Sequence, residues 1–322
     1  MRKITSHKPK IEIGDYIDPL SDFGFKRLFG SEPVKELLID FLNELFQGRK
    51  VVKDLTYDNN EKQGPLAGSR KAIFDLTCTG AEGEQFIIEV QRIRQGYFKD
   101  RAIYYSSRLI HDQVPQGKLW DYSLKEVYFI GLMDFFLEDS IPGEYLQRVH
   151  LAYENSGKVF YKKLEWIFIE IPKFVKSEQE LRTGIDKWVF VLKNMSRLEK
   201  IPAILNSRIF MKLFNIASVS NLSKKDFMKY EKDMMAIWDE YAIKKTLLEE
   251  GREEGRQLGI KEGIEEGIKE GIKEGRKEGR EEGKAQVVKN LILKMAMTDS
   301  QAADIAEVSV AFVRKIRQDL KK

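Results

Sequence analysis

Cysteine and histidine are scarce in this sequence of 322 residues. The single cysteine, Cys78, excludes a disulfide framework and is typical of a protein that works in a reducing compartment. The three histidines, His7, His111 and His150, lack the spacing of a metal-binding cluster. Disulfide-stabilised secreted scaffolds and histidine-ligated zinc modules are therefore excluded.

Long apolar runs are also absent. The most apolar stretch, VYFIGLMDFF at 127–136, is too short to cross a bilayer, and the amino-terminal MRKITSHKPKIEIGDY lacks the apolar core of a signal peptide. We therefore expect a cytoplasmic protein with no membrane partner. The 55 basic and 51 acidic residues leave a net charge of +4, which allows a nucleic-acid partner without requiring one.

The sequence does contain apolar residues at the spacings typical of helices and strands, and their order predicts a mixed α/β domain at 1–175. Its predicted elements are two helices within 22–46 separated at Pro33, a hairpin at 74–91, a helix at about 95–112, a strand at 127–136 and a hairpin pair within 145–171. Three further segments are predicted after this domain: a helical extension at 176–250, a glycine-containing repeat at 251–284 and a basic helical tail at 285–322.

The hairpin at 74–91, FDLTCTGAEGEQFIIEVQ, collects acidic residues on one face. A turn centred near Glu82 places Asp75 directly across from Glu89. Period-two alternation separates an apolar face from a polar one: Phe74, Leu76, Cys78, Phe86, Ile88 and Val90 against Asp75, Thr77, Gln85, Glu89 and Gln91. Because Ile73 and Ile87 keep the polar face partly covered, the opposed carboxylates need a cation between them, either an Arg or Lys side chain or a hard divalent ion such as Mg²⁺.

Several segments of the chain are together similar to one known family. They are DFGFKRLFG near the amino terminus, the hairpin strands FDLTCTG and FIIEVQ, the following YFKDRAIYYSSRLI, and the glycine repeat. In this order they resemble the Rpn-type recombination-promoting nucleases and transposases of the PD-(D/E)XK nuclease superfamily. The resemblance covers nearly the whole chain. It implies a restriction-endonuclease-like α/β core, with a mixed sheet flanked by helices, and a helical carboxy-terminal extension.

The resemblance also implies a role for each residue of the hairpin motif. Asp75 and Glu89 would be catalytic and would hold Mg²⁺ or another divalent cation together with the main-chain carbonyl of Val90. The implied reaction is hydrolysis of DNA phosphodiester bonds by an endonuclease, without a covalent enzyme intermediate, in recombination or on mobile DNA. The alternative is a nuclease-fold protein that binds DNA or a protein partner and no longer cuts.

Gln91 departs from the superfamily pattern, in which lysine usually occupies this catalytic position. A glutamine can orient the attacking water but cannot carry charge. Three residues nearby in the sequence are candidates for the missing cation: Lys71, Arg92 and Lys99. Arg92 and Lys99 are also candidates for contacting nucleic acid.

Two residues of the first helix are placed near the site by the same resemblance. Asp22 is expected to cap the helix that begins near Phe23, and Lys26, one turn on, is expected to contact phosphate. Four aromatic residues after the hairpin are interpreted as core packing rather than base-stacking platforms: Tyr97, Phe98, Tyr104 and Tyr105.

The repeat at 251–284 carries glycine at every fourth position. Glycine weakens an isolated helix, so association with a second copy is one interpretation of this segment. Four isoleucines each follow a glycine and would complete a seam for a homodimer: Ile260, Ile264, Ile268 and Ile272. The other interpretation is a flexible charged tether, and the near balance of acids and bases argues against a DNA-binding stripe.

The tail at 285–322 resembles a helix-turn-helix in its spacing. Ser300 and Ser309 are expected to cap its two short helices. On the second of these helices, three basic residues are predicted to be exposed toward DNA and three apolar residues to pack inward: Arg314, Lys315 and Arg317, and Val310, Val313 and Ile316. A small helical cap that ends the repeat is the alternative.

Overall fold

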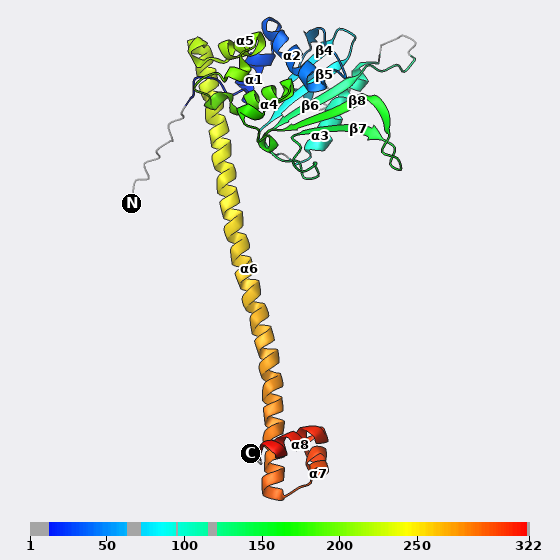
Figure 1. Ribbon diagram of the computed structural model, residues 1–322, viewed down its shortest axis with the longest axis vertical. Helices are drawn as coiled ribbons and strands as arrows, with labels where there is room; N and C mark the ends of the chain where they lie inside the picture. Colours follow the sequence, from blue (N-terminus) through cyan, green and yellow to red (C-terminus); the bar gives the residue numbers. More distant parts are fainter. Residues whose placement is uncertain (1–12, 63–71, 95, 115–120, 321–322) are drawn as a thin grey trace, which may run out of the picture. The chain divides into compact units, whose positions relative to one another are not determined.

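The computed structural model describes residues 13–62, 72–94, 96–114 and 121–320 (Figure 1). The chain divides into two compact units, Met1–Glu240 and Tyr241–Lys322.

The first unit is built on a mixed six-stranded sheet with the order β1-β4-β5-β6-β8-β7. Its strands are β1 (Leu55–Tyr57), β4 (Leu76–Gly80), β5 (Gln85–Gln91), β6 (Val127–Met133), β7 (Leu146–Ala152) and β8 (Val159–Glu170). The β4–β5 and β7–β8 pairs are antiparallel hairpins, whereas β5–β6 and β6–β8 are parallel. A separate two-stranded sheet joins β2 (Glu61–Lys62) to β3 (Ala72–Ile73).

Helices cover both faces of this sheet (Figure 1). Those that begin in the first unit are α1 (Asp22–Phe29), α2 (Lys35–Phe46), α3 (Phe98–Asp112), α4 (Gly184–Asn194), α5 (Arg208–Ala217) and α6 (Lys224–Met295). The first two are separated by a short 3₁₀ turn that contains Pro33, which confirms the predicted break. None of the described helices combines the length and the hydropathy needed to cross a membrane.

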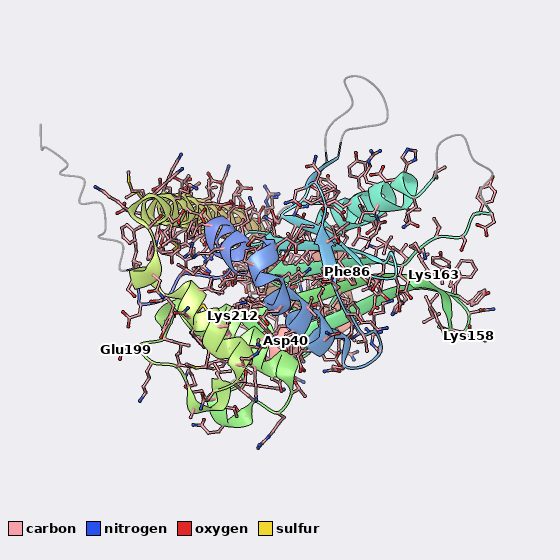
Figure 2. The ribbon with its side chains drawn as sticks, turned by 90° about the horizontal axis from the view of Figure 1, so that it is seen from above. Asp40, Phe86, Lys158, Lys163, Glu199 and Lys212 are labelled. Carbon is pink, nitrogen blue, oxygen red and sulfur yellow. The ribbon has the colours of Figure 1, made fainter. Side chains whose placement is uncertain are left out.

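Two apolar clusters lie on opposite faces of the sheet. The larger one contains side chains from α1, α2, α4 and α5 together with Leu76, Cys78, Phe86 and Ile88. Figure 2 shows Phe86 over the sheet, where its ring lies 6.1 Å from that of Phe46 on α2. The smaller cluster lies under α3 and includes Ile87. The predicted coverage of both hairpin faces is therefore correct, and Cys78 is a buried core residue.

Phe74 belongs to the face opposite to the predicted one. Its backbone N–H donates to the carbonyl of Asn60, and β4 begins only at Leu76, so regular alternation does not extend back through Asp75. The Phe74 ring instead lies 4.8 Å from that of Tyr105 on α3. A local bend before the strand has moved this side chain to the other cluster.

Ser21, rather than the predicted Asp22, caps α1. The Ser21 hydroxyl accepts the backbone N–H of Gly24, whereas Asp22 is the first helical residue and pairs with Lys26 at 2.6 Å. A serine in extended conformation immediately before the helix satisfies a free amide of the first turn better than a residue already inside it. The prediction was therefore displaced by one position.

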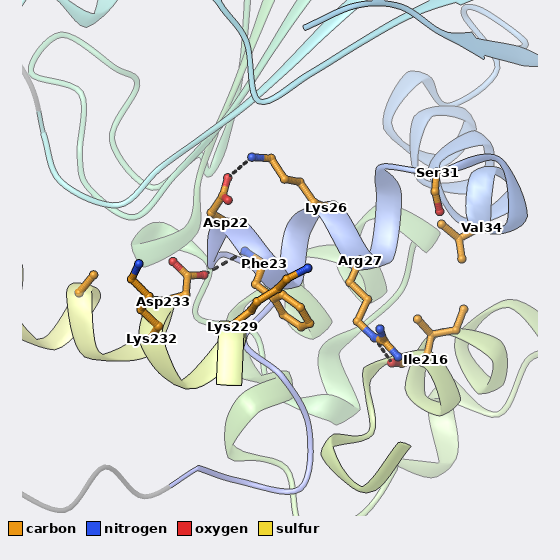
Figure 3. A pocket seen from close by; sticks show the side chains of 11 residues that line it. Asp22, Phe23, Lys26, Arg27, Ser31, Val34, Ile216, Lys229, Lys232 and Asp233 are labelled. Atoms are coloured by element: carbon orange, nitrogen blue, oxygen red, sulfur yellow. Dashed lines mark hydrogen bonds and ion pairs between the residues drawn. The ribbon is translucent and has the colours of Figure 1, made fainter. Parts of the chain in front are cut away.

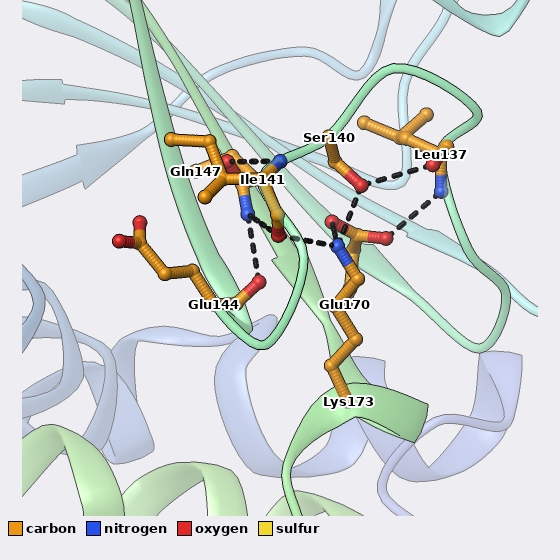
Figure 4. Close-up of polar contacts among 7 residues, drawn as sticks. All are labelled: Leu137, Ser140, Ile141, Glu144, Gln147, Glu170 and Lys173. Carbon is orange, nitrogen blue, oxygen red and sulfur yellow. Dashed lines mark hydrogen bonds and ion pairs between the residues drawn. The ribbon is translucent and has the colours of Figure 1, made fainter.

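A buried carboxylate holds the loop after β6 against the end of β8 (Figure 4). Glu170 has no solvent exposure, accepts the backbone N–H of Leu137 at 2.8 Å and pairs with Lys173 at 2.9 Å. The same loop begins with Asp134, whose N–H donates to the carbonyl of Gln91 at 2.9 Å. These bonds fix the loop beside the carboxyl end of β5.

The second unit contains the remainder of α6 with α7 (Asp299–Ala306) and α8 (Val310–Asp319). Ser309 caps α8 as predicted, but Thr298 caps α7 in place of Ser300, because Gln301 completes a capping box with Thr298. The inward packing of Val313 and Ile316 is confirmed, and the partly buried Val310 also packs against this small core.

The glycine repeat is helical throughout, within α6. A Cβ atom built at any of its glycines would meet no heavy atom within 4 Å. The four isoleucines of the predicted seam are between 52% and 58% exposed. Pairing of this helix with a second copy stays a prediction.

Candidate active site

The register of β4 and β5, continued by one residue, places Asp75 across from Glu89 as predicted. The backbone N–H of Val90 donates to Oδ2 of Asp75 at 2.7 Å, and the backbone N–H of Asp75 donates to Oε1 of Glu89 at 3.0 Å. Each carboxylate is therefore anchored to the backbone of the opposite segment. This reciprocal bonding holds the two carboxyl groups close together in a site where Glu89 is only 4% exposed.

Both carboxyl groups hold a proton more tightly than usual. Burial raises the pKa of Glu89 to about 8, and the Asp75 carboxylate adds to the increase. Burial also raises the pKa of Asp75, and the Asp22 carboxylate adds to that increase. The guanidinium of Arg101 opposes both shifts. A bound cation would favour ionisation of both groups.

Arg101 is a basic residue that the structure brings to this pair, and sequence reasoning missed it. Its Nη2 donates to Oε1 of Gln91 at 2.6 Å and lies 3.6 Å from Oε2 of Glu89. Helical periodicity could have identified Arg101 from the sequence. Phe98 and Tyr105 lie on the packing face of α3, and Arg101 is three residues after Phe98 and four residues before Tyr105, so it lies on the same face. Its guanidinium lies over both of these rings.

Both the oxygen and the nitrogen of the Gln91 side-chain amide form hydrogen bonds within the protein. Oε1 accepts from Arg101, and Nε2 donates to the carbonyl of Ile93 at 3.0 Å. The structure therefore places Gln91 as a support for the guanidinium, next to the carboxylate pair.

Two of the three cations proposed from the sequence pair with other carboxylates. Lys99 pairs with Asp139 at 2.7 Å on the surface, and Arg92 pairs with Asp18 at 2.6 Å. Lys71 lies outside the described residues. Arg92 and Lys99 are therefore engaged with Asp18 and Asp139, whereas Arg101 reaches Glu89 from the following helix.

Asp22 and Lys26 lie within electrostatic range of Asp75. Their charges act on the pKa of Asp75 in opposite directions, the aspartate raising it and the lysine lowering it. Figure 3 shows the two side chains paired on one side of α1, both partly exposed.

The aromatic residues of this region divide into two groups. Phe98 is buried and Tyr105 is partly buried, so the predicted core packing is correct for these two. It is wrong for Tyr97 and Tyr104, which are 84% and 46% exposed. Tyr97 precedes α3 in a left-handed conformation, and Tyr104 lies on the outward side of the helix.

In the second unit, the basic residues of α8 are not equivalent. Arg314 and Lys315 are exposed as predicted. Arg317 is not: its guanidinium donates to Asp299 at 2.6 Å and to the carbonyl of Met297 at 2.6 Å. Arg317 therefore joins α8 to the start of α7, and the prediction that it is exposed toward DNA was wrong.

The chemistry of the carboxylate pair fits a hard divalent cation. One oxygen of each carboxylate accepts a backbone N–H, and these two bonds do not use Oδ1 of Asp75 or Oε2 of Glu89. Within the described residues no group of three or more His, Cys, Asp or Glu side chains could hold a metal ion. Mg²⁺ commonly takes only one or two carboxylates and completes its shell with water and substrate phosphates.

Comparison with known proteins gives the family of this chain. The model of the PD-(D/E)XK nuclease family transposases matches residues 19–246, which include all of the sheet and the carboxylate pair. No significant match is found among curated proteins or among solved structures. The matched region covers most of the chain and its mixed sheet with flanking helices has the expected α/β architecture, so the chain belongs to the PD-(D/E)XK nuclease family transposases.

Proposed function

We propose that this protein is a divalent-metal-dependent DNA endonuclease that hydrolyses phosphodiester bonds, with Mg²⁺ as the natural ion. The observation that carries the proposal is the pair of the partly buried Asp75 and the buried Glu89, held by reciprocal backbone bonds and faced by Arg101. Two carboxyl groups confined close together are costly in an apolar environment and are typical of a functional site.

Asp75, Glu89 and the main-chain carbonyl of Val90 would hold the ion. When bound, such an ion supplies Lewis acidity toward the phosphate and acidifies a water molecule. The protein's own contribution is to keep both carboxylates in a fixed orientation, since each is bonded to the opposite strand.

Arg101 takes the place of the usual lysine in this proposal. Its guanidinium is charged at every physiological pH, and Gln91 fixes its position through a bond of 2.6 Å. A fixed positive charge at this point stabilises the charge that develops on the phosphate during hydrolysis. Gln91 is then a positioning residue, although the second N–H of its amide can still orient water.

The natural substrate in this proposal is mobile or recombining DNA, cut by a homodimer. One site cuts one strand in each event, so two copies are needed to cut a duplex. The glycine repeat of α6 offers the surface for pairing, because its glycines carry no side chain that would keep two helices apart.

A nicking assay on supercoiled plasmid tests the proposal. We expect cleavage with Mg²⁺, none with chelator, and loss of cleavage in both Asp75→Ala and Glu89→Ala. Circular dichroism should show that both variants remain folded. Retained cleavage by both variants would exclude the carboxylate pair as the site.

One observation favours a second candidate, a nuclease-fold protein that binds DNA without cutting. Both ends of the Gln91 amide are bonded within the protein, which limits its capacity to orient water. Specific DNA binding with no cleavage under any divalent metal would support this candidate.

A further inference from the structure

A cleft of about 800 Å³ lies between α1 and the beginning of α6, within the first unit (Figure 3). Part of its lining is apolar, from Phe23, Val34 and Ile216. The charged side chains that line it are four cations and two carboxylates: Lys26, Arg27, Lys229 and Lys232, with Asp22 and Asp233. The lining of the cleft therefore combines a net positive charge with apolar side chains.

Some of these charges are structural. Asp233 accepts the backbone N–H of Phe23 at 2.9 Å and so occupies the amino-terminal end of α1. Arg27 donates to the carbonyl of Ile216 at 3.1 Å and lies 3.7 Å from Asp226. These contacts join α1 to α5 and α6 around the cleft.

The two lysines of α6 are free to bind a ligand. Lys229 and Lys232 are three residues apart and therefore project from the same side of the helix. The Lys229 side chain is 59% exposed and reaches Asp226 only at 3.9 Å. Lys232 is exposed and forms no hydrogen bond or ion pair with any residue that the structure describes. An anion in the cleft would meet two ammonium groups without displacing a close partner.

The cleft adjoins the candidate active site. Asp22 and Lys26 of α1 line it. Asp18, just before α1, pairs at 2.6 Å with Arg92, which directly follows Gln91 at the end of β5. A polyanionic chain lying in the cleft would therefore pass beside the residues proposed to hydrolyse it.

We propose that this cleft binds the sugar–phosphate backbone of the DNA strand next to the bond that is cut, with Lys229 and Lys232 contacting neighbouring phosphates. This inference rests on the proposed endonuclease function. Phosphates suit the two lysines, and the sugar and base faces suit the apolar lining. A nucleic-acid strand uses both the lysines and the apolar side chains of this lining, so it fits the cleft better than an acidic protein segment does.

DNA binding by the full-length chain tests the cleft. A short labelled duplex is titrated at several salt concentrations in the presence of chelator, so that no hydrolysis occurs. The test variant is Lys229→Ala/Lys232→Ala. The matched control is Lys224→Ala/Lys225→Ala, which removes the same charge from two exposed lysines at the start of the same helix that do not line the cleft.

We expect the cleft variant to bind DNA about tenfold more weakly and to lose about two units of the slope of log K against log salt, because each phosphate contact contributes about 0.9. The control should keep the wild-type affinity and slope, and Lys229→Arg/Lys232→Arg should retain binding. An unchanged slope in the cleft variant would overturn the inference, as would equal losses in the cleft variant and the control.

A parallel plasmid assay with Mg²⁺ keeps the two proposals separate. Wild-type protein that binds DNA through the cleft but does not cut would overturn the endonuclease function and leave the cleft in place. Cleavage with unchanged binding in the cleft variant would overturn the cleft alone.

Discussion

At the residue scale, the charge of the site depends on whether Glu89 holds a proton. Burial and the Asp75 carboxylate raise its pKa from 4.5 to about 8 in the folded chain. The folded chain therefore binds this proton more tightly than the unfolded chain does. The contribution of this proton to the free energy of unfolding is therefore fully present below pH 4.5, the usual pKa of a glutamate. It is lost as the pH rises through about 8.

We predict that metal-free protein loses on the order of a few kcal/mol of unfolding free energy between these two pH values. Glu89→Gln should remove most of this dependence, because its amide stays neutral. Urea unfolding at a series of pH values in chelator measures both proteins. A wild-type profile that is flat across this window, or parallel to that of the variant, would contradict the prediction.

Arg101 gives a second prediction at the same scale. We expect Arg101→Gln to lower the cleavage rate by about a hundredfold, because it removes a charged donor next to the reacting phosphate. Mg²⁺ affinity should be retained or increased, since a cation beside Glu89 has been removed. Arg101→Lys should recover part of the rate, because it restores the charge without the fork that bonds Gln91.

Isothermal calorimetry and plasmid cleavage separate these effects. Arg94→Gln is the matched control, since Arg94 is half exposed and pairs with Glu138 away from the carboxylates. Wild-type cleavage by Arg101→Gln would remove Arg101 from the mechanism, and parallel loss of metal binding would make its role structural.

At the scale of the element, the open question is whether the glycine repeat of α6 is a tether or a surface that pairs with a second copy. Glycine recurs every four residues whereas the helix turns every 3.6, so the glycine stripe winds slowly around the helix. Two helices can then share only a few successive repeats. The isoleucine-containing block at 260–272 is the best candidate for this contact.

We predict that Gly263→Ala/Gly267→Ala/Gly271→Ala raises the helicity of the chain, because each replacement favours the helix by about 1 kcal/mol and meets no neighbouring atom within 4 Å. If the glycines lie between two backbones, the added methyl groups should also weaken the dimer about tenfold or more. Circular dichroism and analytical ultracentrifugation measure the two effects. Increased helicity with unchanged association would exclude this contact.

At the scale of the whole molecule, the first unit carries the complete sheet, the carboxylate pair and the cleft. We predict that deletion of 251–322 leaves a folded, monomeric chain that still binds metal but mainly nicks duplex DNA. Leu247 and Leu248 are 63% and 55% exposed, so the core does not depend on the deleted helix for packing.

Light scattering and plasmid cleavage test this prediction. The full chain should be dimeric and should convert plasmid to the linear form more efficiently than the truncated chain. If both chains are monomers at micromolar concentration, the repeat is a tether and the paired-site proposal is wrong.

The sequence by itself determined those features that depend on local pattern. Alternation and the position of the turn gave the register that places Asp75 across from Glu89, and apolar periodicity with Pro33 gave the division between α1 and α2. Such features follow from neighbouring residues, because strand and helix periods are fixed by backbone geometry.

Only the tertiary structure decided which cation faces the carboxylates and where the cleft lies. Arg101 reaches Glu89 because α3 packs back across the sheet, and Lys232 approaches α1 because α6 crosses beside it. Local pattern also failed at Phe74, where a bend before β4 changed its face, and at Arg317, where Asp299 was available as a partner. These contacts join residues far apart in the chain or depend on a break in regular geometry, so the period of a single element does not specify them.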